Sequence, residues 1–143
     1  MKNFLVKDWM TKEVCTAEPK TRMLEAHKLM REKGIRRMPV VRGGKVVGIM
    51  TRSDVRSAQP SSATTLNVWE MNYLLAELRV RDVMSKEVVT IRPEDTIKLA
   101  AELMHERRIG ALPVVDEKNR LVGIITESDI FRVLIAWFNE EQG

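Results

Sequence analysis

The chain has 143 residues, 44% of them hydrophobic, and a formal net charge of +4 from 24 basic and 20 acidic residues. Its single cysteine, Cys15, excludes an internal disulfide and is typical of a reducing compartment. The N-terminal residues lack the apolar core of a signal peptide, and no apolar run approaches the roughly 20 residues that span a bilayer. We therefore expect a cytoplasmic protein with no membrane segment.

The sequence predicts alternating strands and helices. In order, the first half predicts a strand at 14–16, a helix with apolar residues at 23, 26, 29 and 30, strands at 38–41 and 46–50 joined by a glycine turn, and a helix beginning near Ser53. A polar linker at 59–65 follows, and residues 66–78 predict a helix. The second half repeats the series, with a strand at 88–90, a helix at 97–104, strands at 112–115 and 121–125, and a helix beginning near Ser128.

The two halves are copies of one sequence. Val6-Lys7-Asp8-Trp9-Met10 matches Val80-Arg81-Asp82-Val83-Met84, and Pro39-Val40-Val41 matches Pro113-Val114-Val115. The fold class is therefore α/β (α+β), with two β-α-β-β-α repeats that bury a face against each other, an extra linker helix and a long C-terminal helix. The predicted domains are 1–58 for the first repeat, 59–79 for the linker and 80–143 for the second repeat.

Two helices carry more apolar surface than a surface helix needs. The helix at 66–78 has an apolar stripe with aromatic residues beside it, and the C-terminal helix is apolar nearly all round. We expect these two helices to form the subunit interface of a homodimer. The alternative is that they only cover the sheet of their own chain.

Each copy places the same loop before its last helix, Thr51-Arg52-Ser53-Asp54 in the first and Thr126-Glu127-Ser128-Asp129 in the second. Unpaired N–H groups and the dipole at a helix start favour a phosphate, and an ionised Asp can accept two hydrogen bonds from a ribose diol. The same pattern also satisfies helix capping, with Thr51 or Ser53 as the N-cap and an acid in the first turn. On the residues alone, capping is favoured.

The repeated segments resemble tandem cystathionine-β-synthase (CBS) domains, in their openings, their Pro-Val-Val strands and their Gly-x-x-Thr-x-Ser-Asp loops. Residues 61–78, with Asn72-Tyr73-Leu74-Leu75, are also similar to the linker of small bacterial CBS proteins of the acetoin-utilisation type. The resemblance implies a pseudo-twofold pair, or Bateman module, that dimerises into a flat disc. It also implies two clefts between the repeats that bind adenosine nucleotides.

The resemblance further implies which residues bind the ligand. It makes Thr51 and Thr126 phosphate contacts and Asp54 and Asp129 ribose contacts. The remaining candidates lie in the same loops, before the second strand of each copy and at the ends of the first strands: Ser53, Ser128, Ile35, Arg36, Arg37, Met38, Pro39, Ile109, Gly110, Ala111, Pro113, Thr16 and Thr90.

Arg36 and Arg37 would donate to a phosphate as bidentate groups, whereas Gly110 and Ala111 carry no charge. We therefore expect two related sites of unequal affinity, with the more basic one favoured. Without a ligand, the arginine pair is explained as a solvated basic edge. Thr16 and Thr90 are then explained by ordinary β-propensity.

We expect a regulatory module that senses AMP, ADP or ATP, with S-adenosylmethionine or NAD as other ligands, and that acts on an unidentified protein. We expect no catalysis and no metal, because His27 and His105 have no partner at ligand spacing and Cys15 is better explained as a buried hydrophobe. The alternatives are a dimerising scaffold without a ligand and, less favoured, a nucleic-acid-binding protein.

Overall fold

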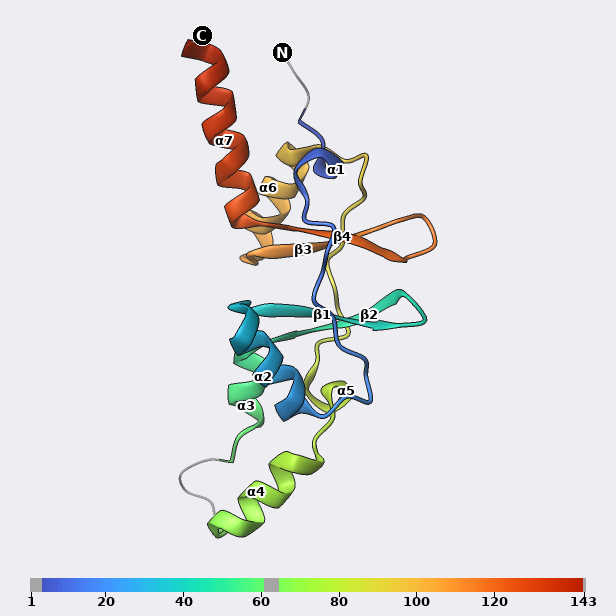
Figure 1. Ribbon diagram of the computed structural model, residues 1–143, viewed down its shortest axis with the longest axis vertical. Helices are drawn as coiled ribbons and strands as arrows, with labels where there is room; N and C mark the ends of the chain where they lie inside the picture. The colour runs from blue at the N-terminus through green and yellow to red at the C-terminus, as the bar shows by residue number, and fades with distance from the viewer. Residues whose placement is uncertain (1–3, 61–64, 143) are drawn as a thin grey trace. The chain divides into compact units, whose positions relative to one another are not determined.

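The computed structural model describes residues 4–60 and 65–142 (Figure 1). Helices are mixed with two small antiparallel sheets, and a helix ends the chain, as predicted. In chain order the elements are α1 (Val6–Trp9), α2 (Met23–Lys33), β1 (Arg37–Arg42), β2 (Lys45–Thr51), α3 (Arg52–Ala58), α4 (Val68–Glu77), α5 (Val80–Val83), α6 (Ile97–Arg107), β3 (Ala111–Val115), β4 (Leu121–Thr126) and α7 (Glu127–Gln142). Within the described residues, no helix has the length and apolar character that a bilayer span requires.

The chain divides into two compact units, which we call the central unit, residues 15–88, and the N/C unit, residues 1–14 and 89–143. These units do not coincide with the predicted domains at 1–58 and 80–143. The opening segment of each sequence repeat packs in the core of the unit that holds the rest of the other repeat. Val80 is fully buried in the central unit, and Val6 is fully buried in the N/C unit.

In the central unit, β1 and β2 form an antiparallel hairpin in which Arg37 pairs with Thr51. Helices α2, α3 and α5 cover one face of this hairpin (Figure 1). Its core is rich in methionine, since Met23, Met30, Met38 and Met50 are all fully buried. Flexible thioether side chains fill the irregular space between short helices and a two-stranded sheet.

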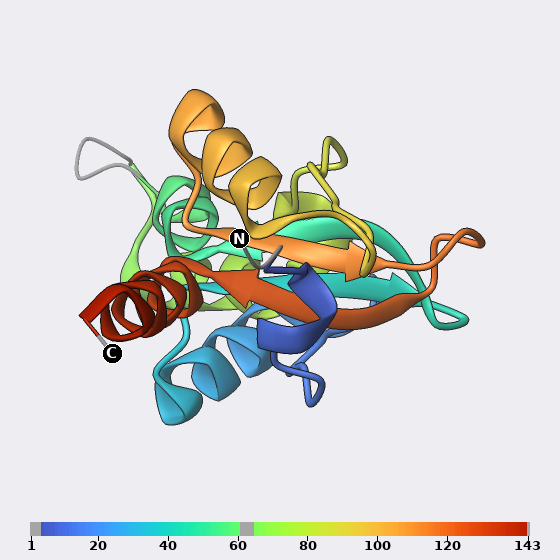
Figure 2. The ribbon, with the colours of Figure 1, turned by 90° about the horizontal axis from the view of Figure 1, so that it is seen from above.

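The N/C unit repeats this plan with β3 and β4, whose register pairs Ala111 with Thr126. Helices α1, α6 and α7 gather on one face of the hairpin (Figures 1 and 2). The core is more branched than that of the central unit, with Ile97, Leu112 and Ile125 at positions where the central unit has methionine.

Two predicted strands, at 14–16 and 88–90, are not formed. The chain instead makes one parallel bridge in each unit, Ala17 with Val40 and Ile91 with Val114. A proline follows two residues after each bridging residue and cannot donate a further ladder hydrogen bond, so pairing stops there. The predicted linker at 59–65 lies partly outside the described residues, because 61–64 are not described.

Arg108, just after α6, adopts a left-handed conformation with φ 55°, while the matching position after α2 is Gly34 with φ 65°. A side chain there costs about 1 kcal/mol relative to glycine. We expect Arg108→Gly to raise the free energy of unfolding by about 0.5–1 kcal/mol in urea denaturation, and the reciprocal Gly34→Arg to lower it. A loss of stability in Arg108→Gly would contradict this account.

Candidate ligand-binding loops

The loop Thr51-Arg52-Ser53-Asp54 of the central unit is a capping box. The Thr51 hydroxyl oxygen accepts from the backbone N–H of Asp54 at 3.1 Å, and Asp54 Oδ2 accepts from the backbone N–H of Thr51 at 2.7 Å. Thr51 is thus the N-cap, one of the two residues proposed for that role from the sequence. Within the described residues, the second oxygen of Asp54, Oδ1, forms no hydrogen bond.

Arg52 ties this loop to the segment that precedes β1. Its backbone N–H donates to the carbonyl of Arg36 at 3.1 Å, and its Nε donates to the carbonyl of Ile35 at 3.2 Å. The structure therefore brings Ile35 and Arg36 to the loop that carries Asp54 and the exposed hydroxyl of Ser53.

The other candidates before and within β1 differ in exposure. Arg36 is exposed and Arg37 is half-buried, and neither forms an ion pair among the described residues. Met38 and Pro39 are fully buried, and Met38 belongs to the core of the central unit. A phosphate contact is therefore open to the two arginines, whereas Met38 and Pro39 act mainly through packing.

Thr16 is half-buried and lines a pocket of about 340 Å³ together with Met38 and residues of α2. Its lining combines the apolar residues Ala17 and Leu29 with three charged residues of α2, Glu25, Lys28 and Glu32. Thr90, the matching residue of the N/C unit, is also half-buried and directly precedes the Ile91 bridge. Thr16 is thus part of a concave surface that could accept a flat apolar group.

The loop Thr126-Glu127-Ser128-Asp129 of the N/C unit has the same backbone plan but a different set of partners. Asp129 Oδ2 accepts from the backbone N–H of Thr126 at 2.9 Å and from its hydroxyl at 3.2 Å. Asp129 Oδ1 accepts from Arg132 Nη1 at 2.9 Å. Asp129 is only 5% exposed, so both oxygens are engaged in a buried position.

The segment before β3 is tied to this loop as in the central unit, because the backbone N–H of Glu127 donates to the carbonyl of Gly110 at 3.1 Å. Ala111 and Pro113 are buried, and Ser128 is exposed. Ile109 lines a pocket of about 590 Å³ between α6 and α7, whose other lining residues are Ala101, Met104, His105, Arg108, Glu127, Ile130 and Phe131.

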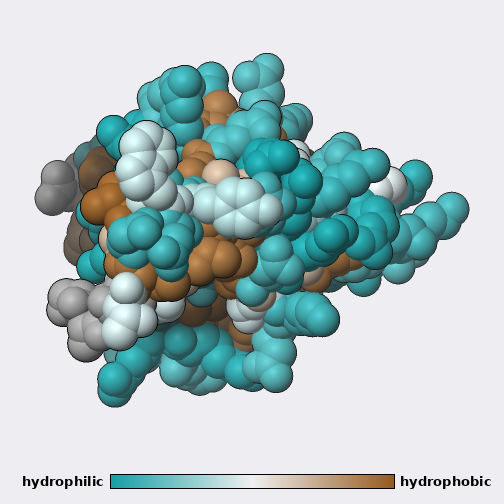
Figure 3. Space-filling view, turned by 90° about the horizontal axis from the view of Figure 1, so that it is seen from below, coloured by the Kyte–Doolittle hydropathy of each residue, from teal (hydrophilic) through white to brown (hydrophobic). Residues whose placement is uncertain are grey.

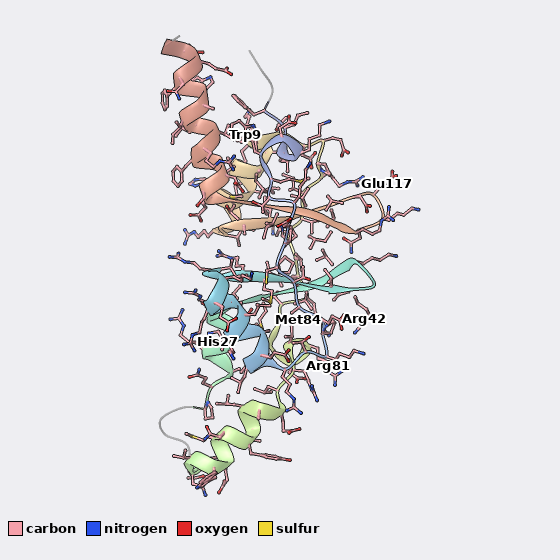
Figure 4. The ribbon with its side chains drawn as sticks, in the orientation of Figure 1. Trp9, His27, Arg42, Arg81, Met84 and Glu117 are labelled. Atoms are coloured by element: carbon pink, nitrogen blue, oxygen red, sulfur yellow. The ribbon has the colours of Figure 1, made fainter. Side chains whose placement is uncertain are left out.

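His27 projects from α2 (Figure 4). Partial burial lowers the pKa of His27, and the charges of Arg31 and Arg52 lower it further. The unfolded chain then binds the proton more readily, so the stability contributed by neutral His27 is complete above its ordinary pKa of 6.5 and is lost as the pH falls below that value. The variant His27→Ala carries the residue that the second copy has at this position, Ala101. As the pH is lowered from about 6.5 to 5, we expect the melting temperature of this variant to fall less steeply than that of the unaltered protein. Identical pH profiles in the two proteins would contradict this.

No group of three or more His, Cys, Asp or Glu side chains that could hold a metal ion occurs among residues 4–60 and 65–142. Cys15 is half-buried against the core of the central unit.

Two residues near the second loop were not identified from the sequence, Arg132 and Trp9. Arg132 stands three residues after Asp129, a spacing that places both on one side of a helix and was available as a signal. Its guanidinium lies 5.4 Å from the centroid of the Trp9 ring. The contact with Trp9 could not be anticipated, because Trp9 belongs to the other sequence repeat.

Comparison with known proteins agrees with the resemblance that the sequence predicts. A family model for the CBS domain matches residues 6–61 and 80–136. The chain is similar to a solved structure assigned to acetoin utilization (AcuB) from Vibrio cholerae, at 31% identity and a TM-score of 0.82, over 99% of this chain and 98% of that one. The predicted resemblance to a tandem pair, and to the acetoin-utilisation type, is confirmed.

Two further solved structures hold adenosine ligands. One is the CBS domain pair of protein MJ0100 in complex with 5′-methylthioadenosine and S-adenosyl-L-methionine, at 29% identity and a TM-score of 0.76, over 94% of this chain and 98% of that one. The other is CBSX2 in complex with AMP, at 26% identity and a TM-score of 0.78, over 93% and 97%. The chain spans only 47%, 23% and 42% of three longer curated relatives.

Proposed function

Because the chain belongs to the CBS domain family and carries two such domains, we propose that it is a regulatory module that binds an adenosine nucleotide and catalyses no reaction. The ligand is AMP, ADP or ATP, or a related adenosyl compound such as S-adenosylmethionine or NAD. The complexes of related pairs with AMP and with S-adenosyl-L-methionine support this class of ligand. Binding would act on a partner protein by stabilising one conformation of the module.

The observation that carries this proposal is the free oxygen of Asp54. Capping uses only Oδ2, so the same carboxylate can cap α3 and still accept a hydrogen bond from a ribose hydroxyl. The capping and binding interpretations of the loop are therefore compatible.

The charges around the Asp54 loop favour an anionic ligand. Arg36 and Arg37 have no acidic partner within the described residues, and Arg52 follows the N-cap directly. Guanidinium groups bind phosphate through two parallel hydrogen bonds, which suits a nucleotide better than a nucleoside. Adenine would then use an apolar surface such as the one lined by Thr16 and Met38.

The test is a thermal-shift series with AMP, ADP, ATP, S-adenosylmethionine and NAD, followed by calorimetric titration of the best ligand. A ligand at 100 times its dissociation constant should stabilise the folded protein by about 2.7 kcal/mol. The double variant Arg36→Gln, Arg37→Gln should lower the affinity for AMP more than the affinity for adenosine. Lys98→Gln, on the exposed side of α6, should change neither affinity. No shift with any of the five ligands at millimolar concentration would refute the proposal.

A second function, assembly of a homodimer, is favoured by the exposed apolar side chains of α4 and α7. Trp69 is 84% exposed on α4 and Phe131 is 62% exposed on α7. The others are Val68, Tyr73, Leu74, Leu134, Ile135, Trp137 and Phe138. Apolar side chains also reach the surface in the view from below (Figure 3). Large exposed apolar side chains gathered on one helix, as on α4 and on α7, are typical of protein interfaces.

We propose that these two helices bind a second copy of the chain. Light scattering at micromolar concentration should give the mass of a dimer, and Trp69→Glu or Ile135→Glu should shift the protein toward monomer. A monomer in the unaltered protein would contradict this proposal without affecting nucleotide binding. Nucleic-acid binding, the weakest alternative, would instead reveal itself by a steep dependence on salt concentration.

A further inference from the structure

The two loop acids, Asp54 and Asp129, are equivalent in sequence but not in their free hydrogen-bonding capacity. Asp54 is half-buried and uses one oxygen for the cap. Asp129 is buried and uses both, one on Thr126 and the other on Arg132. An ionised carboxylate binds a ribose diol through its free lone pairs, so the first loop offers a whole oxygen, whereas the matching oxygen of the second loop already accepts from a guanidinium.

Arg132 is held in place from a second side. Its guanidinium lies over the ring of Trp9, which extends from α1 toward α7 (Figure 4). The Trp9 ring is itself packed edge-on against Phe4, with the ring centroids 5.8 Å apart. Although the Arg132 side chain is 59% exposed, a charge-assisted hydrogen bond and an aromatic face both fix its end.

The described part of the central unit, residues 15–60 and 65–88, has no counterpart of this arrangement. The central unit has Ser57 at the position that matches Arg132 of the N/C unit, and Val83 at the position that matches Trp9. A serine cannot reach over a ring, and a valine offers no ring to stack on. The difference between the two loops therefore comes from two substitutions outside the shared Thr-x-Ser-Asp motif.

We propose that Arg132, held by Trp9, closes the second loop to a ribose, so that the chain binds one nucleotide through Asp54. This inference rests on the proposed nucleotide-binding function. A diol approaching Asp129 must first displace a guanidinium from a buried carboxylate and from an aromatic face. At Asp54 it meets an oxygen that has no hydrogen-bond partner in residues 4–60 and 65–142. Arg132 is thus a specificity-determining residue that acts by occupying the acceptor.

The test is calorimetric titration of the full chain with AMP. The unaltered protein should bind one equivalent. Asp54→Asn, which keeps an oxygen for the cap but loses the charge, should weaken binding at least about tenfold. The matched variant Asp129→Asn should leave the dissociation constant within about twofold, because its oxygens are already engaged.

Arg132→Ser, which gives the second copy the residue of the first, should create a second binding equivalent that disappears when Asp129→Asn is added. Trp9→Val, which removes only the aromatic support, should also expose a second and weaker equivalent. Circular dichroism melts check that each variant is folded.

Three results would overturn the inference alone: two equivalents in the unaltered protein, weakened binding in Asp129→Asn, or a single equivalent in folded Arg132→Ser and folded Trp9→Val. Absence of AMP binding in the unaltered protein and in all variants would instead count against AMP as the ligand, and so against the proposed nucleotide-binding function. The two failures are therefore distinguishable.

Discussion

Val80→Asp is expected to destabilise the central unit by at least about 3 kcal/mol, although Val80 belongs to the second sequence repeat. The Val80 side chain is fully buried among the core residues of the central unit. Its backbone N–H donates to the carbonyl of Thr21 at 2.8 Å, and the next N–H, that of Arg81, donates to the carbonyl of Pro19 at 2.9 Å. A carboxylate at this position would be buried without a partner.

Hydrogen exchange measured by mass spectrometry locates the effect. Val80→Asp should remove protection from α2, β1 and β2, whereas Val6→Asp should do so for α6, β3 and β4. Arg81→Asp, an exposed neighbour on the same short helix, controls for the added charge. If Val80→Asp instead unprotects α6 and β4 and leaves β1 and β2 protected, the exchange of opening segments between the repeats is wrong.

The exchange of opening segments marks the limit of what the sequence could predict about the fold. Aligning Val6 with Val80 shows that the segments are equivalent, but equivalence does not say which core each one enters. Both choices bury the same valine in the same kind of core, so hydrophobic pattern alone cannot distinguish them. Only the path of the chain does, because backbone hydrogen bonds join Val6 to Asp95 and Val80 to Thr21.

Local features were predicted best where the signal extends over several residues. The hairpins, the long helices and the buried methionines Met30 and Met104 follow from periodicity and turn chemistry. The short helices α1 and α5 have only four residues, which is too few to display a helical period. The single bridges at Ala17 and Ile91 form only when a distant strand supplies the partner, so no local pattern specifies a strand there.

The candidate site shows the same division between local and long-range information. The Thr51–Asp54 capping box is local and was anticipated as one interpretation of the loop. The state of each carboxylate is not local, because it depends on what the surrounding elements supply. Identical motifs thus produced one acid with a free oxygen and one that is fully engaged, and the motif alone would have assigned them the same role.

Gly123→Val is expected to cost about 2–3 kcal/mol of stability, because β4 lies against the chain near Met10 without room for a side chain. A Cβ on Gly123 would lie 2.6 Å from Met10 Sδ and 3.0 Å from the carbonyl oxygen of Thr11. In the central unit, a Cβ on Gly48 would lie 2.5 Å from Met84 Sδ and 3.0 Å from the carbonyl oxygen of Ser85. Figure 4 shows Met84 beside the β1–β2 hairpin.

The contact with the Met10 side chain and the contact with the Thr11 carbonyl oxygen should respond differently when the Met10 side chain is shortened. A thioether can move or be removed, whereas the carbonyl oxygen is fixed by the bridge that joins Thr11 to Ile124. Met10→Ala should therefore restore only part of the stability lost in Gly123→Val, and urea denaturation of the single and double variants measures the coupling. Gly43→Asn, at a turn glycine with φ 57° and open space around it, should be nearly neutral. If Met10→Ala restored all of the lost stability, the Met10 side chain would be the sole reason for a glycine at position 123. The close approach of the Thr11 carbonyl oxygen would then make no contribution.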